Sequence, residues 1–170
     1  MLAAMFAFAH HLAAFCLFAA LAVERMLIRG EFSLASARLL LRADRIYGIA
    51  AGAILAIGFA RMKWFEKTPD YYLHSAPFIA KIALFALIGL ISIYPTRKLL
   101  GWRKALAANE LPTVDTATRR RLATVIHLEL GLLVALILCA ALMAKGVGQI
   151  HQTPNPQSSS TAIHFQAGMA

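Results

Sequence analysis

The chain has 170 residues, of which 60% are hydrophobic and 15% are charged, and its mean hydropathy is +0.67. Soluble domains average about 45–50% apolar and about 25% charged residues, so this composition excludes an ordinary soluble enzyme and indicates an integral membrane protein. The length suits one helical bundle. The net charge of +9 does not indicate nucleic-acid binding, because the basic residues lie at the ends of apolar runs, where membrane topology accounts for them.

The first apolar run, residues 2–23, contains no charged residue and is long enough to span a bilayer. It lacks the basic start of a signal peptide and exceeds the usual apolar core of about 7–15 residues, so we expect a retained helix. His10 and His11 lie near its middle. Neighbouring residues project about 100° apart on a helix, so the two imidazoles cannot face the same partner. Either both are polar residues hydrogen-bonded within the bundle, or one is a cofactor ligand or proton carrier.

Residues 24–45 form a basic, amphipathic connection, in which Ser33 is placed to cap a helix over 34–45. The second apolar run, 46–60, is too short to span alone, so its flanks are expected to extend it to a helix of about 42–62. Gly48 and Gly52 form a Gly-x-x-x-Gly pair within it. This spacing lets another helix approach closely, and it is the predicted face of a homo-oligomer.

The third span, residues 71–94, contains Lys81 well inside its apolar run. A lysine near the bilayer centre costs roughly 2.5–3.5 kcal/mol on insertion scales, so we expect Lys81 to face the bundle interior. His74 precedes it by seven residues and shares its helical face. Pro95 is predicted to end this helix at Tyr94.

The fourth span, residues 122–144, carries His127 and Glu129 two residues apart, and therefore on nearly opposite sides of a helix. Residues 149–170 are rich in Pro, Ser and Gln and are predicted to be a disordered tail. The predicted fold is therefore all-α: a four-helix transmembrane bundle within residues 1–148, with helices at about 2–23, 42–62, 71–94 and 122–144.

Lysine and arginine counts predict the orientation. The connections 24–45 and 95–121 hold five and seven of them, against three in 61–70, one in the segment from Lys145 onward and none at the N-terminus. Because basic loops stay in the cytoplasm, both termini are expected on the periplasmic side of a bacterial inner membrane.

Depth then predicts two polar layers in the bundle. At about 1.5 Å per residue, His10 and Lys81 lie at nearly the same level in the outer half. The outer layer holds His10 or His11, His74 and Lys81, with His10 expected to meet Lys81. The inner layer is expected to form structural arginine–carboxylate pairs among its charged and tyrosine residues: Glu24, Arg25, Asp44, Arg45, Tyr47, Tyr94 and Arg97.

Three segments, 9–33, 40–52 and 71–96, resemble a bacterial family of predicted membrane proteins of unknown function, and the resemblance covers about residues 5–145. More remotely, the pattern is similar to the HemJ-type protoporphyrinogen oxidases and CopD-like membrane proteins. Those are small bundles with a histidine in the first helix and, in the HemJ type, a lysine in the third. The resemblance maps these residues to His10 or His11 and to Lys81. The chain departs from the HemJ pattern at Ile79, where that family has another histidine.

Three functions follow as alternatives, and the sequence does not decide whether the protein is an enzyme. The first is a redox protein that binds haem b or a porphyrin, with His10, His11, His74 and Lys81 as cofactor-binding residues, His10 as haem iron ligand and Lys81 as catalytic residue. The second is a small transporter or proton-relay module. The third is a structural or accessory membrane protein without catalysis.

Overall fold

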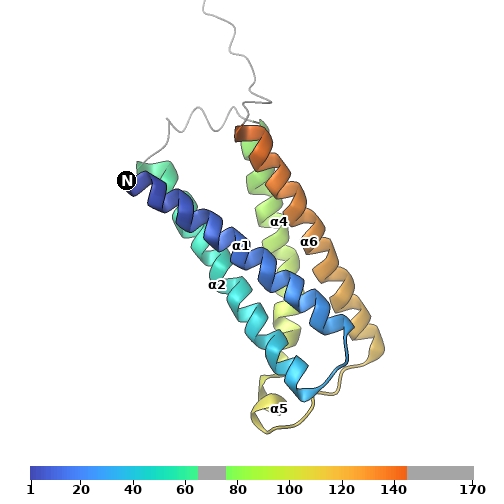
Figure 1. Cartoon of the computed structure of the whole chain (residues 1–170). Coiled ribbons are helices and arrows are strands. Elements are labelled where there is room, and N and C mark those ends of the chain that lie inside the picture. The colour runs from blue at the N-terminus through green and yellow to red at the C-terminus, as the bar shows by residue number, and fades with distance from the viewer. Residues whose placement is uncertain (65–75, 145–170) are drawn as a thin grey trace, which may run out of the picture.

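A computed structural model describes residues 1–64 and 76–144 of the chain (Figure 1). Within them it is entirely helical, with α1 at Leu2–Arg29, α2 at Leu34–Trp64, α4 at Ala76–Gly101, α5 at Arg103–Ala107 and α6 at Thr116–Ala144. In this part of the chain, four helices (α1, α2, α4 and α6) are long and apolar enough to cross a membrane. The predicted all-α four-helix transmembrane bundle is therefore confirmed. His74 and the tail lie outside the described residues.

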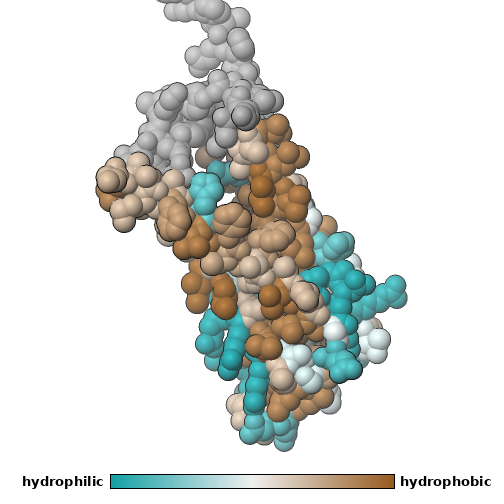
Figure 2. Space-filling view, in the orientation of Figure 1, coloured by the Kyte–Doolittle hydropathy of each residue, from teal (hydrophilic) through white to brown (hydrophobic). Residues whose placement is uncertain are grey.

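The four long helices are arranged as two pairs. Helix α1 packs along α2 and α4 packs along α6, while α1 also contacts α6. Figure 1 shows the pairs close together toward α5 and separated toward the N-terminus. The buried core lies mainly in the half nearer α5, with large side chains from three of these helices: Leu17, Leu21, Ile28, Leu40, Leu122 and Ile126. Apolar side chains also cover much of the outer surface (Figure 2), as expected for helices that face lipid.

The first connection is much shorter than predicted, because α1 continues to Arg29 and α2 begins at Leu34. Helix α1 continues because Glu24 and Ile28 extend the buried stripe of its apolar run. The predicted cap is confirmed: Ser33 Oγ accepts a 3.2 Å hydrogen bond from the Ser36 amide. The Ser33 amide in turn donates to Ser36 Oγ at 2.8 Å, which satisfies a second amide at the start of the helix.

The predicted end of the third helix is wrong, because Pro95 lies inside α4, which continues to Gly101. A proline within a helix leaves the carbonyl four residues earlier without its amide donor and usually bends or breaks the helix. Here the following turn is held by tertiary contacts. The Thr96 hydroxyl donates to Asp44 on α2, and Leu99 is buried in the core.

The two basic connections pack against each other at the α5 end. The rings of Phe32 and Trp102 meet edge to face, with centroids 5.4 Å apart. Arg38 on α2 donates to the Leu106 carbonyl at 3.3 Å and to the side chain of Asn109. The first and third connections therefore lie on one side of the bundle.

Helix α6 begins at Thr116, earlier than the predicted residue 122, and Asp115 caps it. One carboxylate oxygen of Asp115 accepts a 3.3 Å hydrogen bond from the Thr118 amide. Hydrogen bonding by Thr118 also lowers the pKa of the Asp115 carboxyl from its usual value. The extra turns allow α6 to reach the C-terminal end of α1.

Candidate functional site

The two histidines of α1 have different surroundings. His10 is half-buried and its imidazole lies against α2, because a Cβ built on Gly58 would be 3.9 Å from His10 Cε1. His11 is exposed, and its ring centroid lies 6.2 Å from that of His10 at nearly a right angle. At 3.9 Å an added Cβ would make only an ordinary van der Waals contact, so the His10 ring packs beside position 58 of α2.

The tautomer of His11 follows from its contact with its own helix. His11 Nδ1 lies 2.6 Å from the Ala7 carbonyl oxygen. A carbonyl only accepts, so Nδ1 carries a proton, and in the neutral imidazole Nε2 then keeps its lone pair. This is the arrangement in which an imidazole can ligate a metal or accept a proton through Nε2.

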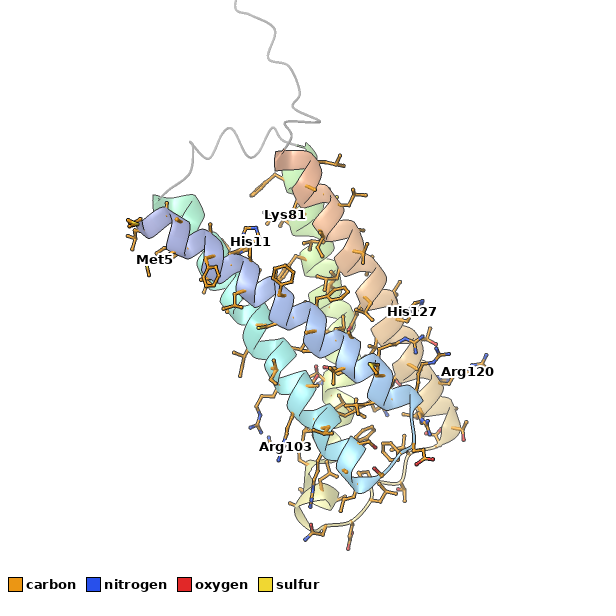
Figure 3. The ribbon with its side chains drawn as sticks, in the orientation of Figure 1. Met5, His11, Lys81, Arg103, Arg120 and His127 are labelled. Atoms are coloured by element: carbon orange, nitrogen blue, oxygen red, sulfur yellow. The ribbon has the colours of Figure 1, made fainter. Side chains whose placement is uncertain are left out.

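Lys81 is half-buried on α4, and its Nζ lies 5.9 Å from the centroid of the Phe78 ring one helical turn earlier. This is within the range of a cation–π contact. Figure 3 shows Lys81 and His11 toward the end of the bundle away from α5. Of the predicted outer layer, His10, His11 and Lys81 are among the described residues, and the fourth member, His74, is not.

A second polar site lies in the core, nearer α5. The carboxylates of Glu24 on α1, Asp44 on α2 and Glu129 on α6 are only 2%, 6% and 1% exposed. Glu24 interacts electrostatically with both Asp44 and Glu129, and Glu129 also interacts with Asp44. We call these three residues the carboxylate cluster.

The helical repeat explains why the carboxylates meet. Each occupies a core-facing position on its helix, four or three residues after a buried aliphatic side chain: Leu21 before Glu24 by three, Leu40 before Asp44 by four, and Ile126 before Glu129 by three. Residues three and four apart lie on one face of a helix, so packing the apolar faces together also buries the acids.

The predicted arginine–carboxylate pairs of the inner layer are not formed by the carboxylate cluster. Glu24 Oε1 and Glu129 Oε1 are buried and form no hydrogen bond with any residue in the described part of the chain. Arg45 and Arg97 are exposed. The reason is rotational: the acids follow the apolar stripes into the core, whereas the long basic side chains extend to the surface.

Among the described residues, hydroxyl groups accompany the carboxylate cluster. The Thr96 hydroxyl on α4 donates to Asp44 Oδ1 at 2.6 Å. The buried Tyr47 on α2 lies within electrostatic reach of all three carboxylates and near Ser92 on α4. All four long helices therefore contribute a polar side chain to this region of the core.

The arrangement does not favour a protein-ligated metal. Over residues 1–64 and 76–144, no group of three or more His, Cys, Asp or Glu side chains is placed to hold a metal ion. His127 is exposed and Glu129 is buried, which agrees with their predicted opposite directions.

One protein family matches the chain over most of its length. Residues 2–148 match the family described as predicted membrane protein (DUF2214). The chain belongs to this family. The predicted resemblance to a family of membrane proteins of unknown function is therefore confirmed. Neither the curated proteins nor the solved structures contain a match.

The family's description names a membrane location and no activity, so function has to be argued from the side chains. Sequence reasoning placed Glu24 and Asp44 in the inner layer but did not group Glu129 with them. The periodicity of the apolar residues carried the necessary signal, because each acid falls on the buried stripe of its helix.

Proposed function

We propose that this protein is a proton-relay module of the membrane, in which the carboxylate cluster takes up and releases protons inside the bundle. The observation that carries the proposal is the burial of Glu24, Asp44 and Glu129, from three different helices, without an arginine or lysine partner among the described residues. Ionisable side chains that face the interior of a transmembrane bundle are typical of proton relays.

Electrostatics supports proton exchange over a purely structural role. Moving one ionised carboxylate into a protein interior costs several kcal/mol even after relaxation, and like charges close together add to this cost. Three buried carboxylates without a counter-charge are therefore stable only if the cluster retains protons. Because the three carboxylates interact electrostatically, a proton on one of them changes the proton affinity of the other two, and this coupling favours exchange between the sites.

The neighbouring hydroxyls extend the set of groups that can accept or donate a proton. The Thr96 hydroxyl donates to Asp44 Oδ1. Tyr47 lies beside the cluster and near Ser92, farther along α4 toward Lys81. A hydroxyl both donates and accepts, so each of these residues can pass a proton without holding a charge.

The proposal is tested by proton flux into liposomes that contain the full-length protein. A pH-sensitive dye inside the vesicles records uptake driven by a potassium diffusion potential. We expect flux well above that of empty liposomes. Glu24→Gln and Glu129→Gln preserve side-chain shape and remove the titrating group, so each is expected to lower the flux at least tenfold.

The matched control is Glu31→Gln, because Glu31 is exposed in the connection between α1 and α2 and lies outside the carboxylate cluster. It makes the same chemical change and is expected to leave the flux unaltered. Wild-type flux no higher than the empty-vesicle rate would refute the proposal. So would full activity of both buried glutamine variants.

A haem- or porphyrin-binding redox function is the second candidate, and His11 supports it. Its Nδ1 is held by the Ala7 carbonyl, so Nε2 is directed away from that contact with a free lone pair. Bound haem would supply electron transfer. His11 would hold the iron, and Lys81 would hold a propionate by charge. The roles that the remote resemblance to HemJ-type proteins implies are part of this candidate function. In them, His10 is the alternative iron ligand and His74 is a further contact to the cofactor.

A visible absorption spectrum of the purified protein tests the haem candidate. A Soret band that disappears in His11→Phe and persists in His10→Phe would assign the ligand to His11. The reverse result would assign it to His10. A protein that is colourless as purified and retains no added haemin would exclude this candidate and leave the proton-relay proposal intact.

We also propose that the protein self-associates through the Gly48 and Gly52 face of α2. Both glycines are exposed, and a Cβ built on either would meet no atom within 4 Å, so none of the described residues of the same chain fills that face. Gly48→Leu is expected to convert the oligomer to a monomer in light scattering of the detergent-solubilised protein. A wild-type monomer would refute this assignment.

A further inference from the structure

A pocket of about 740 Å³ lies where the C-terminal end of α1 meets the start of α6. Its lining combines basic residues, among them Arg25, Arg29 and Arg120, with apolar ones, among them Ile28 and Phe32. Figure 2 shows hydrophilic side chains gathered over this part of α6, and Figure 3 places Arg120 and His127 there. We call it the arginine pocket. It is separate from the carboxylate cluster and does not depend on the proposed proton relay.

The arginines have different tasks. Arg119 is committed to the fold: its Nε donates to the Ile28 carbonyl at 2.8 Å, and one of its terminal nitrogens donates to the Arg29 carbonyl at 3.2 Å. Arg25 is not committed in this way. Its Nη1 forms no hydrogen bond with any residue that the structure describes, and its half-buried side chain is part of the pocket lining. A guanidinium that is not engaged by the protein's own acceptors can bind an anionic oxygen instead.

The rest of the lining also favours an anion. No aspartate or glutamate is among the described residues that line the pocket. Four arginine side chains therefore line one space: Arg25, Arg29, Arg119 and Arg120.

The apolar lining residues indicate what the anion is attached to. Ile28, Phe32, Val114 and Ala123 line the pocket together with the arginines, and the adjacent ends of α1 and α6 belong to helices that can span a membrane. An anionic lipid presents this combination, with a phosphate at the interface and acyl chains beside it.

We propose that the arginine pocket binds a phosphate-bearing anion, with Arg25 and Arg120 as its recognition residues. The phosphate group is supplied either by an anionic phospholipid or by a free phosphate in solution. A guanidinium recognises both through paired hydrogen bonds to two oxygens.

The test measures the melting temperature of the full-length protein in neutral detergent. Dioleoylphosphatidylglycerol, dioleoylphosphatidylcholine and sodium phosphate are titrated separately, with sodium chloride at matched ionic strength. A ligand that binds only the folded protein raises its melting temperature. We expect phosphatidylglycerol to do so at a concentration at least tenfold below any effect of phosphatidylcholine.

The test variant is Arg25→Gln with Arg120→Gln, which is expected to raise the half-saturating concentration of phosphatidylglycerol about tenfold or more. The matched control is Arg42→Gln with Arg103→Gln, because both arginines are exposed on α2 and α5 and neither lines the pocket. The control carries the same change of charge and should bind like the wild type. If the double variant is unstable, the single variant Arg120→Gln, at an exposed position, takes its place in the comparison with the wild type.

Each outcome has a defined meaning. Selective stabilisation by phosphatidylglycerol, lost in the pocket variants only, supports a lipid site. Stabilisation by sodium phosphate above the sodium chloride control, lost in the same variants, supports a site for free phosphate. Equal loss in the pocket and control variants would show unspecific attraction to the basic surface and would overturn the proposal. No stabilisation by either probe would also overturn it.

Discussion

The Thr96 hydroxyl on α4 donates a 2.6 Å hydrogen bond to Asp44 Oδ1 on α2. This bond joins the two helix pairs of the bundle, since α2 packs with α1 and α4 packs with α6. It also lies one residue after Pro95, where α4 has lost a backbone hydrogen bond. One polar contact thus holds the helices together and satisfies a buried carboxylate.

Thr96→Val removes the hydroxyl and keeps the side-chain shape, so Asp44 loses a buried donor. We expect the free energy of unfolding to fall by about 1–3 kcal/mol, the usual cost of leaving one buried polar group unsatisfied. Thermal unfolding in detergent measures it. Thr124→Val is the control, because the Thr124 hydroxyl bonds only to the Arg120 carbonyl of its own helix. Equal stability of both variants would argue against a role for Thr96 in joining the pairs.

Glu24→Gln is expected to leave the melting temperature unchanged or to raise it. The amide is nearly the same size as the carboxyl, cannot ionise, and cannot repel Asp44 or Glu129. Replacing a buried charge by a well-packed neutral group is often neutral or stabilising by about 1–4 kcal/mol. Combined with the loss of proton flux, this result would separate function from folding. A melting temperature well below that of the wild type would instead indicate a structural role for the carboxylate.

Arg119→Gln is expected to destabilise the junction of α1 and α6. Arg119 donates to the carbonyls of Ile28, Arg29 and Gly30, and the shorter glutamine side chain cannot reach these acceptors. Hydrogen bonds that involve a charged group contribute about 1.5–3 kcal/mol each. The unfolding temperature in detergent should drop clearly. Arg121→Gln, at an exposed neighbouring position, should change it little. A similar small effect in both variants would show that solvent replaces these bonds without cost.

Lys81→Met removes the amine and keeps the length of the side chain. If Lys81 faces the bundle interior and serves the site, the variant should insert normally but lose proton flux or bound cofactor. If it only extends toward the interface, stability should be unchanged or higher and function retained. Membrane insertion, proton flux and the absorption spectrum are compared with the wild type. Unchanged values of all three would exclude a functional Lys81.

The orientation is predicted from the basic residues of the first and third connections, which the structure brings to one side of the bundle. We expect this side to face the cytoplasm and both termini to face the periplasm. A cytoplasmic reporter fused at Gly101 should be active, and one fused at Pro154 should be inactive. Cytoplasmic activity of the Pro154 fusion would reverse the assignment.

The sequence by itself determined the membrane class, the four spanning helices and the Ser33 cap. These features depend on composition, on run length and on neighbours within four residues, which are local properties of the chain. The same local rules misplaced the end of α4, because tertiary contacts carry that helix past Pro95. The signal for α1 and α6 was also incomplete, since charged residues within their terminal turns were assigned to connections.

Only the tertiary structure decided which polar side chains meet. Charge and depth placed arginines and acids at one level, and the simplest expectation was that they pair. The rotation of each helix about its axis sets the outcome instead: the apolar stripes turn Glu24, Asp44 and Glu129 into the core and leave Arg25 at the arginine pocket. That rotation is fixed by how four apolar faces pack together, and no single helix contains this information.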